Sequence, residues 1–213
     1  MSSRQKRTYH KGNVREDLLS MAEKILKEET VQKITVRSLT SRVGVTPGNF
    51  YNHFENLNEL LANVAAKKMR ERIKRVKDAR NKHRKPLLRL KAGARETVHM
   101  AFENPESYRL MMGNLVPSLT DYPVFYDAAE DSFEALNKEL YGEGVYDRHD
   151  LKASHKRCPH SYALMSLLNG VTRDVIDGLV NLDSLEEIDE FTDTMMDSLL
   201  CGRAFFDLED RLT

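Results

Sequence analysis

Apolar residues recur at helical spacing along almost the whole of this chain. The first stripe comprises Val14, Leu18, Met21, Ala22 and Ile25, and it predicts an amphipathic helix over residues 13–29. The same period predicts further helices over 57–80, 87–103, 106–112, 123–141, 159–182 and 185–207. Gly, Pro and runs of β-branched residues are few, so strands are not expected. The pattern therefore predicts an all-α fold of about nine helices.

Residues 35–54 carry the signals of two short helices joined by a tight turn. Thr35 is suited to cap the first of them, and Gly44 to end it, because glycine accepts the backbone conformation that a helix stop requires. Thr46 is suited to cap the second helix, with Pro47 at its first position, where a missing N–H costs nothing. Together with helix 13–29, these two helices predict a three-helix unit containing a helix-turn-helix.

The second short helix has two different faces. Phe50 and Phe54 are four residues apart, so they share one inward face. The opposite face carries small, amide, phenolic and imidazole groups, namely Gly48, Asn49, Tyr51, Asn52 and His53. Because such a face can approach base edges and phosphates closely, we predict binding to double-stranded DNA. The alternative is a helical interaction protein that does not bind DNA, in which this face is simply solvated.

Charge is distributed unevenly, although the 33 basic and 33 acidic residues cancel. Residues 1–95 hold 24 Lys and Arg against 9 Asp and Glu, and residues 96–213 hold 9 against 24. This asymmetry suggests that only the first half meets a polyanion. Arg4, Lys6, Arg7 and Lys11 form a basic arm of the kind that follows phosphates or enters the minor groove. The basic run 67–95 is either a solvated helix surface or, in its distal part, a further DNA contact.

Other classes of protein have little support in the sequence. No apolar run reaches the roughly 18 residues needed to span a membrane, and the N-terminus lacks an apolar signal core. A cytoplasmic protein without a membrane partner is therefore expected. Gly-rich phosphate loops, nucleophile motifs and metal-hydrolase helices are missing, so we expect no enzymatic activity and no cofactor. Cys158 and Cys201 are far apart, which does not indicate a disulfide scaffold.

One cluster of side chains leaves a metal-binding alternative open. His149, His155, Cys158 and His160 fall in a short charged stretch, and His and Cys side chains bind zinc or copper. Their spacing matches no standard structural zinc pattern, and His is common in charged loops for solubility alone. A metal or redox sensor is kept as an alternative, and no metal site is predicted.

Residues 13–64 resemble the DNA-binding domain of the tetracycline-repressor (TetR) family of bacterial regulators. The resemblance rests on segments 35–39, 43–54 and 59–61, above all on Gly44-Val-Thr-Pro-Gly48 at its spacing from Tyr51-Asn-His-Phe54. It implies a DNA-binding domain over residues 1–56 and a helical effector-binding and dimerisation domain over 57–213. The implied function is that of a ligand-responsive transcriptional regulator, here expected to be a repressor.

The resemblance also implies roles for nine DNA-binding residues. Thr35 would cap its helix and meet a phosphate, Arg37 would reach a guanine edge or a phosphate, Thr46, Tyr51 and His53 would hold the backbone, and Pro47, Gly48, Asn49 and Asn52 would face the groove. Two positions depart from the family pattern. Leu57 stands where a phosphate-binding Lys is usual, and Thr40 stands where Ala is usual. The second change is tolerable if the hydroxyl bonds back to a helix carbonyl.

A homodimer on a palindromic operator is expected, because one recognition helix of this size reads few base pairs. The last two predicted helices carry more apolar residues than one stripe buries, so the interface is predicted at Leu164, Leu168, Val171, Val175, Met195 and Leu199. The effector pocket is predicted among aromatic and Met side chains, at Met100, Tyr108, Met111, Met112, Phe125, Tyr126, Phe133 and Met165. Since Arg109 is the one basic residue near this set, we expect a small apolar effector that releases the protein from DNA.

Overall fold

The computed structural model describes residues 13–112, 121–150, 154 and 156–201, and all regular structure in them is helical. Nine α-helices and one 3₁₀ helix have bounds within these residues: α1 (Val14–Glu28), η1 (Val31–Lys33), α2 (Val36–Val43), α3 (Pro47–Tyr51), α4 (Leu57–Asn81), α5 (Pro86–Glu103), α6 (Pro105–Met112), α7 (Pro123–Tyr141), α9 (Pro159–Ile176) and α10 (Leu185–Cys201). The predicted all-α fold is confirmed. Within the described ranges, no helix is long and apolar enough to cross a membrane.

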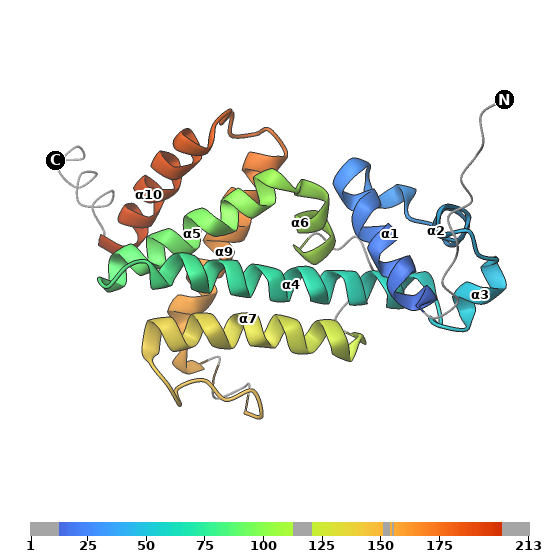
Figure 1. Ribbon diagram of the computed structural model, residues 1–213. Coiled ribbons are helices and arrows are strands. Elements are labelled where there is room, and N and C mark those ends of the chain that lie inside the picture. Colours follow the sequence, from blue (N-terminus) through green and yellow to red (C-terminus); the bar gives the residue numbers. More distant parts are fainter. Residues whose placement is uncertain (1–12, 113–120, 151–153, 155, 202–213) are drawn as a thin grey trace.

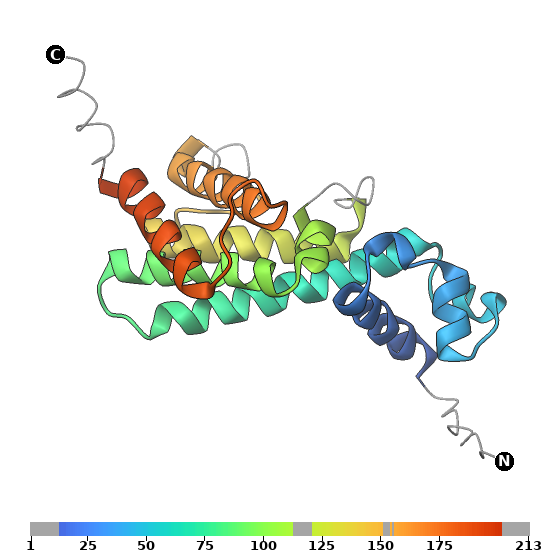
Figure 2. The same cartoon turned by 90° about the horizontal axis from the view of Figure 1, so that it is seen from above.

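Helix α4 is the axis of the molecule. It is continuous over 25 residues, so its length is about 37 Å at 1.5 Å per residue. The head, by which we mean helices α1 to α3, lies at one end of α4, and α10 lies toward the other end (Figures 1 and 2). Along its length α4 contacts α1, α5, α6 and α7, and α5 in turn contacts α9 and α10. Most of the other helices thus pack on α4 or α5, whereas α2 packs on α1 and α3 packs on α2.

The largest apolar core begins in the head and continues into the rest of the molecule. Leu39 and Phe50 are completely buried in the head, and the same cluster of side chains includes Leu110 of α6 and the first half of α4. A hydrogen bond of 2.8 Å from the Val31 amide to Glu106 Oε2 also ties the head to α6. The head therefore packs directly on the helices that follow it, and one apolar core spans residues on both sides of Leu57, where α4 begins.

Two smaller apolar clusters hold the other helices together. The first joins α5, α7, α9 and α10 through Ala94, Leu136, Leu164, Leu168 and Met196. The second comprises Val98, Val175 and Ile188 and joins α5 to α9 and α10. Both clusters are centred on α5, so the acidic second half of the chain is built around a helix that belongs mostly to the basic first half.

Ion pairs between the two halves of the chain explain part of the uneven charge. Arg89 on α5 binds Glu139 on α7 at 2.6 Å. Lys91 on α5 binds Asp197 on α10 at 2.6 Å, and Arg95, one turn further along α5, pairs with Asp193 on α10. These three cations of the basic run therefore neutralise acidic helices of the same chain, whereas Lys82, Arg84 and Lys85 of that run are exposed.

The helix ends agree with the sequence patterns except at a few places. α9 ends at Ile176, six residues before the predicted end at 182, and Gly178 follows with φ +73°, a conformation that favours glycine and stops a helix. The 3₁₀ turn η1 was not predicted. The basic arm, most of the predicted loop 113–121, and the last residues of the predicted helix 185–207 lie outside the described residues.

Candidate DNA-binding surface and effector cavity

Local hydrogen bonds fix the two helices of the helix-turn-helix. Thr35 caps α2 through a reciprocal pair of 3.0 Å bonds, in which Thr35 Oγ1 accepts from the Ser38 amide and Ser38 Oγ accepts from the Thr35 amide. Gly44 ends α2 with φ +85°, in the left-handed region. Thr46 Oγ1 accepts from the Asn49 amide at 3.3 Å and so begins α3, with Pro47 at its first position. The predicted caps and the predicted helix stop are confirmed.

The nine residues predicted to contact DNA all have accessible surface around α2 and α3. Thr35, Arg37, Thr46, Pro47, Gly48, Tyr51 and Asn52 are exposed, and Asn49 and His53 are half-buried. Tyr51 keeps 59% of its surface exposed while the edge of its ring packs against Phe50, with ring centroids 5.3 Å apart. The ring of Tyr51 is therefore held in position by Phe50 while most of its surface stays accessible to a partner.

The two departures from the family pattern have local explanations. Thr40 Oγ1 donates to the Val36 carbonyl at 2.8 Å, so its buried hydroxyl is satisfied as predicted. Leu57 is half-buried against the core of the head, where a Lys would have to leave its charge at the edge of an apolar cluster. On α2, Arg42 binds Glu29 at 2.6 Å, whereas Arg37 forms no ion pair with any described residue. Arg37 is thus the cation of α2 that is available to an outside partner.

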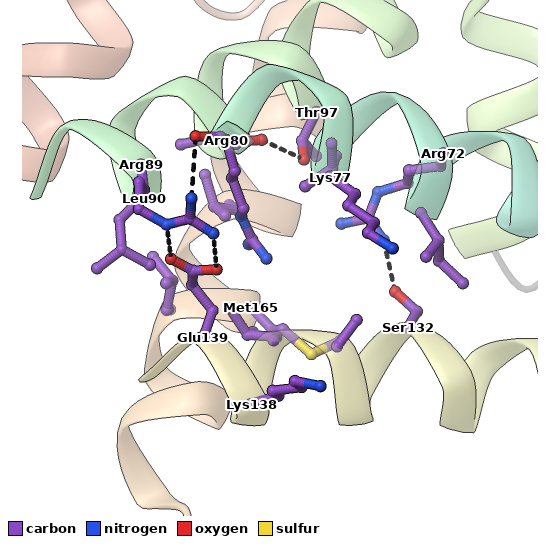
Figure 3. A pocket seen from close by; sticks show the side chains of 18 of the residues that line it. Arg72, Lys77, Arg80, Arg89, Leu90, Thr97, Ser132, Lys138, Glu139 and Met165 are labelled. Atoms are coloured by element: carbon purple, nitrogen blue, oxygen red, sulfur yellow. Dashed lines mark hydrogen bonds and ion pairs between the residues drawn. The ribbon is translucent and has the colours of Figure 1, made fainter. Parts of the chain in front are cut away.

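A cavity of about 430 Å³ lies among α4, α5, α7 and α9 (Figure 3). Its apolar walls include Ile73, Val76, Leu136, Leu164, Met165 and Leu168. Five basic residues also line it, namely Arg72, Lys77, Arg80, Arg89 and Lys138, against Glu139 as the one acidic residue of the lining. Its size is within the range of pockets that hold small molecules.

Two arginines of α4 face this cavity without an anionic partner. Arg72 donates from Nη1 to Ser132 Oγ at 3.0 Å, but neither Arg72 nor Arg80 forms an ion pair with a described residue. The Nε atom of each is buried and lacks a hydrogen-bond partner among the described residues. Burial lowers the pKa of both guanidiniums from the ordinary arginine value, because it disfavours the charged form. Both oxygens of Glu139 accept from Arg89, at 2.6 and 2.8 Å, so this carboxylate is already used.

Of the eight residues predicted to line an effector pocket, only Met165 lines this cavity. Met100, Tyr108 and Met111 line a second cavity, of about 320 Å³, among α1, α4, α5 and α6. Phe125 and Met112 belong to or pack against the largest core, Tyr126 is exposed, and Phe133 packs against Tyr146 and Tyr162. Three of these aromatic and Met side chains therefore line the smaller cavity and one lines the larger cavity, whose walls also carry long basic side chains.

Comparison with solved structures identifies the fold. No protein-family model matches the sequence, and no curated protein sequence matches it significantly. A TetR transcriptional regulator from Rhodococcus sp. RHA1 matches with a TM-score of 0.58 and 16% identity, over 87% of this chain and 96% of that one. The chain has the TetR-family fold.

Two further structures with this TetR-family fold were solved with small molecules bound. The transcriptional regulator FadR from Bacillus subtilis, in complex with stearoyl-CoA, matches with a TM-score of 0.64 and 14% identity, over 88% of this chain and 98% of that one. The regulator RolR, in complex with resorcinol, matches with a TM-score of 0.54 and 18% identity, over 86% and 85%. At these identities the similarity is one of fold.

Within the TetR-family fold, the residues predicted for a dimer interface do not share one exposed face. Leu164, Leu168 and Val175 are buried inside the protomer, because they pack in the clusters around α5. Val171 and Met195 are half-buried, and Leu199 keeps 39% of its surface exposed. Some of the apolar residues that suggested an interface are thus buried in the core of a single protomer.

The His and Cys stretch does not form a metal centre in the part of the chain that is described. Cys158 is completely buried, and His160 Nδ1 lies 2.9 Å from the hydroxyl of Tyr141. His155 lies outside the described residues. Among the described residues there is no group of three or more His, Cys, Asp or Glu side chains suited to a metal ion.

Proposed function

We propose that this protein is a ligand-responsive transcriptional regulator, acting as a repressor that binds a palindromic operator as a homodimer. Residues 1–56 would bind DNA, and residues 57–213 would bind the effector and the second protomer. The observation that carries the proposal is the accessible surface over α2 and α3, which combines a helix-turn-helix with exposed groups suited to phosphates and bases. The TetR-family fold supports it.

The proposed DNA contacts divide into two kinds. Asn49 on α3 offers an amide that can pair with adenine, and Arg37 on α2 offers a guanidinium that can bind guanine. Thr35, Tyr51 and His53 would hold phosphates and fix the position of the head on the duplex. Specificity would then rest on two side chains and on the close approach of the α3 backbone.

The proposed dimer uses the outward surfaces of α9 and α10. On α9 the exposed or half-buried face carries the small residues Ala163, Ser166 and Gly170, and a Cβ added at Gly170 would meet no atom within 4 Å. On α10, Leu199 and Leu200 each keep 39% of their surface exposed. Small side chains allow helices to approach closely, and the exposed leucines supply apolar area, so this surface suits a second copy of the chain.

Helix α4 would couple the effector to the DNA. Its first half lies in the core of the head, and its second half supplies Arg72, Val76 and Arg80 to the cavity wall. An effector that binds more tightly to one tilt of α4 than to another would shift the population of dimers toward heads that are wrongly spaced for the operator. The uninterrupted course of α4 makes it the direct physical link between the two sites.

The decisive experiment is selection of bound sequences from a random pool of double-stranded DNA by the purified full chain. We expect an enriched palindrome. On that site, Asn49→Ala and Arg37→Ala should each cost about 1–3 kcal/mol, while binding to random DNA changes little. Ser41→Ala, on an exposed residue of α2 with no proposed contact, is the matched control.

The outcome of this selection separates the proposal from its main alternative. A pool without sequence enrichment would favour the helical interaction protein that does not bind DNA. If the substitutions weaken binding equally on the palindrome and on random DNA, Asn49 and Arg37 contact only phosphates and do not read bases.

A further inference from the structure

The uncompensated positive charge of the larger cavity calls for a partner. Arg72 and Arg80 lie two helical turns apart on the same face of α4 and line the same space (Figure 3). Arginine remains protonated in proteins, so both guanidiniums keep their charge inside the fold. Burial is the main cause of the lowered pKa of Arg80; the charge of Glu139 opposes the shift, and the charge of Arg72 adds to it.

The acidic side chains near the cavity supply that partner only in part, because the charge of Glu139 acts on Arg80 without forming an ion pair with it. Glu139 is held by Arg89 through two hydrogen bonds, as in a forked arginine–carboxylate pair. Lys138, at the same wall, pairs with Glu143 outside the lining at 2.5 Å. Neither pair reaches the two arginines by a hydrogen bond among the described residues. Arg72 and Arg80 are half-buried, with their Nε atoms buried and unpartnered among the described residues, so an anion placed between them would be stabilised.

Close packing holds Arg80 in place. A Cβ at Gly93 on α5 would stand 2.5 Å from Arg80 Nε and 3.2 Å from Nη2. The absence of a side chain at Gly93 therefore makes the room that the Arg80 guanidinium occupies between α4 and α5. On the other side, Ser132 Oγ accepts from Arg72 at 3.0 Å and fixes that side chain toward α7. Both cations are thus positioned rather than loosely extended.

The remaining walls are apolar. Ile73 and Val76 of α4 lie opposite Leu136 of α7 and the α9 residues Leu164 and Met165 in the lining. A ligand that suits the whole cavity must therefore carry negative charge at one part and hydrocarbon at another. A purely apolar molecule would leave both guanidiniums unpaired, and a small inorganic anion would leave the apolar walls uncovered.

We propose that this cavity binds an amphipathic carboxylate, with the carboxylate between Arg72 and Arg80 and the hydrocarbon against α7 and α9. This inference rests on the proposed function in naming the class of its effector, and it replaces the expectation of an uncharged apolar effector. Each of the two carboxylate oxygens would accept a charge-assisted hydrogen bond from one guanidinium, and such bonds are stronger than those between neutral groups.

Isothermal titration calorimetry of the full chain with decanoate, decanol and decyl phosphate tests the proposal without any DNA. Decanoate should bind about tenfold or more tightly than decanol. Arg72→Met and Arg80→Met should each weaken decanoate by about tenfold or more and leave decanol unchanged or improved. Arg84→Met, at an exposed residue that does not line the cavity, should change nothing. Tighter binding of decyl phosphate than of decanoate would overturn the choice of a carboxylate.

Three results would overturn the site itself: equal binding of decanoate and decanol, binding of neither, or wild-type binding of decanoate by both Met variants. Folding provides a check, because removing a buried unpaired charge should leave thermal stability unchanged or higher. Release of a selected operator by decanoate is measured separately. If decanoate binds but does not release the operator, the cavity is a ligand site without the proposed regulatory role. If the operator binds but decanoate does not, only the cavity proposal is refuted and the proposed function stands.

Discussion

Two glycines of the helix-turn-helix predict opposite responses to the same substitution. Gly44 has φ +85°, and a Cβ there would meet no atom within 4 Å. Gly48 lies in α3 without a positive φ, and a Cβ there would lie 3.9 Å from Thr46 Oγ1, which is an ordinary contact. Alanine therefore encounters only backbone strain at position 44, and neither strain nor a clash at position 48.

These geometries give the expected magnitudes. An L residue in the left-handed region costs roughly 1–2 kcal/mol, so Gly44→Ala should lower the free energy of unfolding by about that amount. Within a helix, alanine is favoured over glycine by roughly 0.5–1 kcal/mol, so Gly48→Ala should raise stability. In a chain of this size each kcal/mol shifts the melting temperature by about 2–4 °C. The two variants should thus melt on opposite sides of the wild type.

DNA binding should be weakened in Gly48→Ala, the variant that is expected to be more stable. Gly48 is exposed on the proposed recognition surface, so an added methyl group would stand between α3 and the groove and cost about 1–3 kcal/mol on the selected operator. The assays are thermal unfolding by circular dichroism and operator titration by fluorescence anisotropy. A more stable Gly48→Ala protein that binds its operator at full affinity would refute the close approach of α3, and an unchanged melting temperature for Gly44→Ala would refute the left-handed turn.

Three further substitutions test the core, the dimer and the ion pairs. Phe50→Ala empties a completely buried position and should cost about 3–5 kcal/mol, measured by urea unfolding; a loss below about 1 kcal/mol would contradict the packing of the head. Leu199→Glu should give a folded monomer in analytical ultracentrifugation, whereas Leu168→Glu should unfold the protomer, because Leu168 is buried; a Leu199→Glu dimer would move the interface elsewhere. The hydrogen bonds from Arg89 hold the pKa of Glu139 below its usual 4.5, so the stability that this pair contributes is present above that pH and is lost as the pH falls through the lowered value. Glu139→Gln should therefore be less stable than the wild type near pH 7, with the difference shrinking on acidification, and a difference independent of pH would exclude ionisation as the cause.

Helix caps and turns were accessible from the sequence because their causes are local. Thr35, Gly44 and Thr46 act through hydrogen bonds and backbone angles within a few residues, so the local sequence alone predicts these caps and this turn. The end of α9 was harder, because the apolar residues after Ile176 continue the helical period while Gly178 breaks it. There a local backbone signal outweighed the periodicity.

The cavity could not be found from side-chain type alone. Aromatic and Met side chains were expected to line it, but large apolar groups such as Phe125 bury themselves in the core. The useful signal was positional: Arg72 and Arg80 stand four residues on either side of Val76, on the apolar stripe of α4. Within a run of basic residues, the cations that face a cavity can be told from the solvated ones only when the positions of the neighbouring helices are known.

The unbroken course of α4 has a consequence for the size of the signal. Leu60 in the head core and Arg80 in the cavity wall are separated by about 30 Å of rigid helix, from 20 residues at 1.5 Å each. A tilt of about 5° at one end then displaces the other by about 2.6 Å, and two heads tilting apart would change their separation by about 5 Å. One turn of DNA spans roughly 34 Å and about 10 base pairs, so this change corresponds to about one and a half base-pair steps. A lever of this length lets a ligand act through a small angle, with no change inside the head itself.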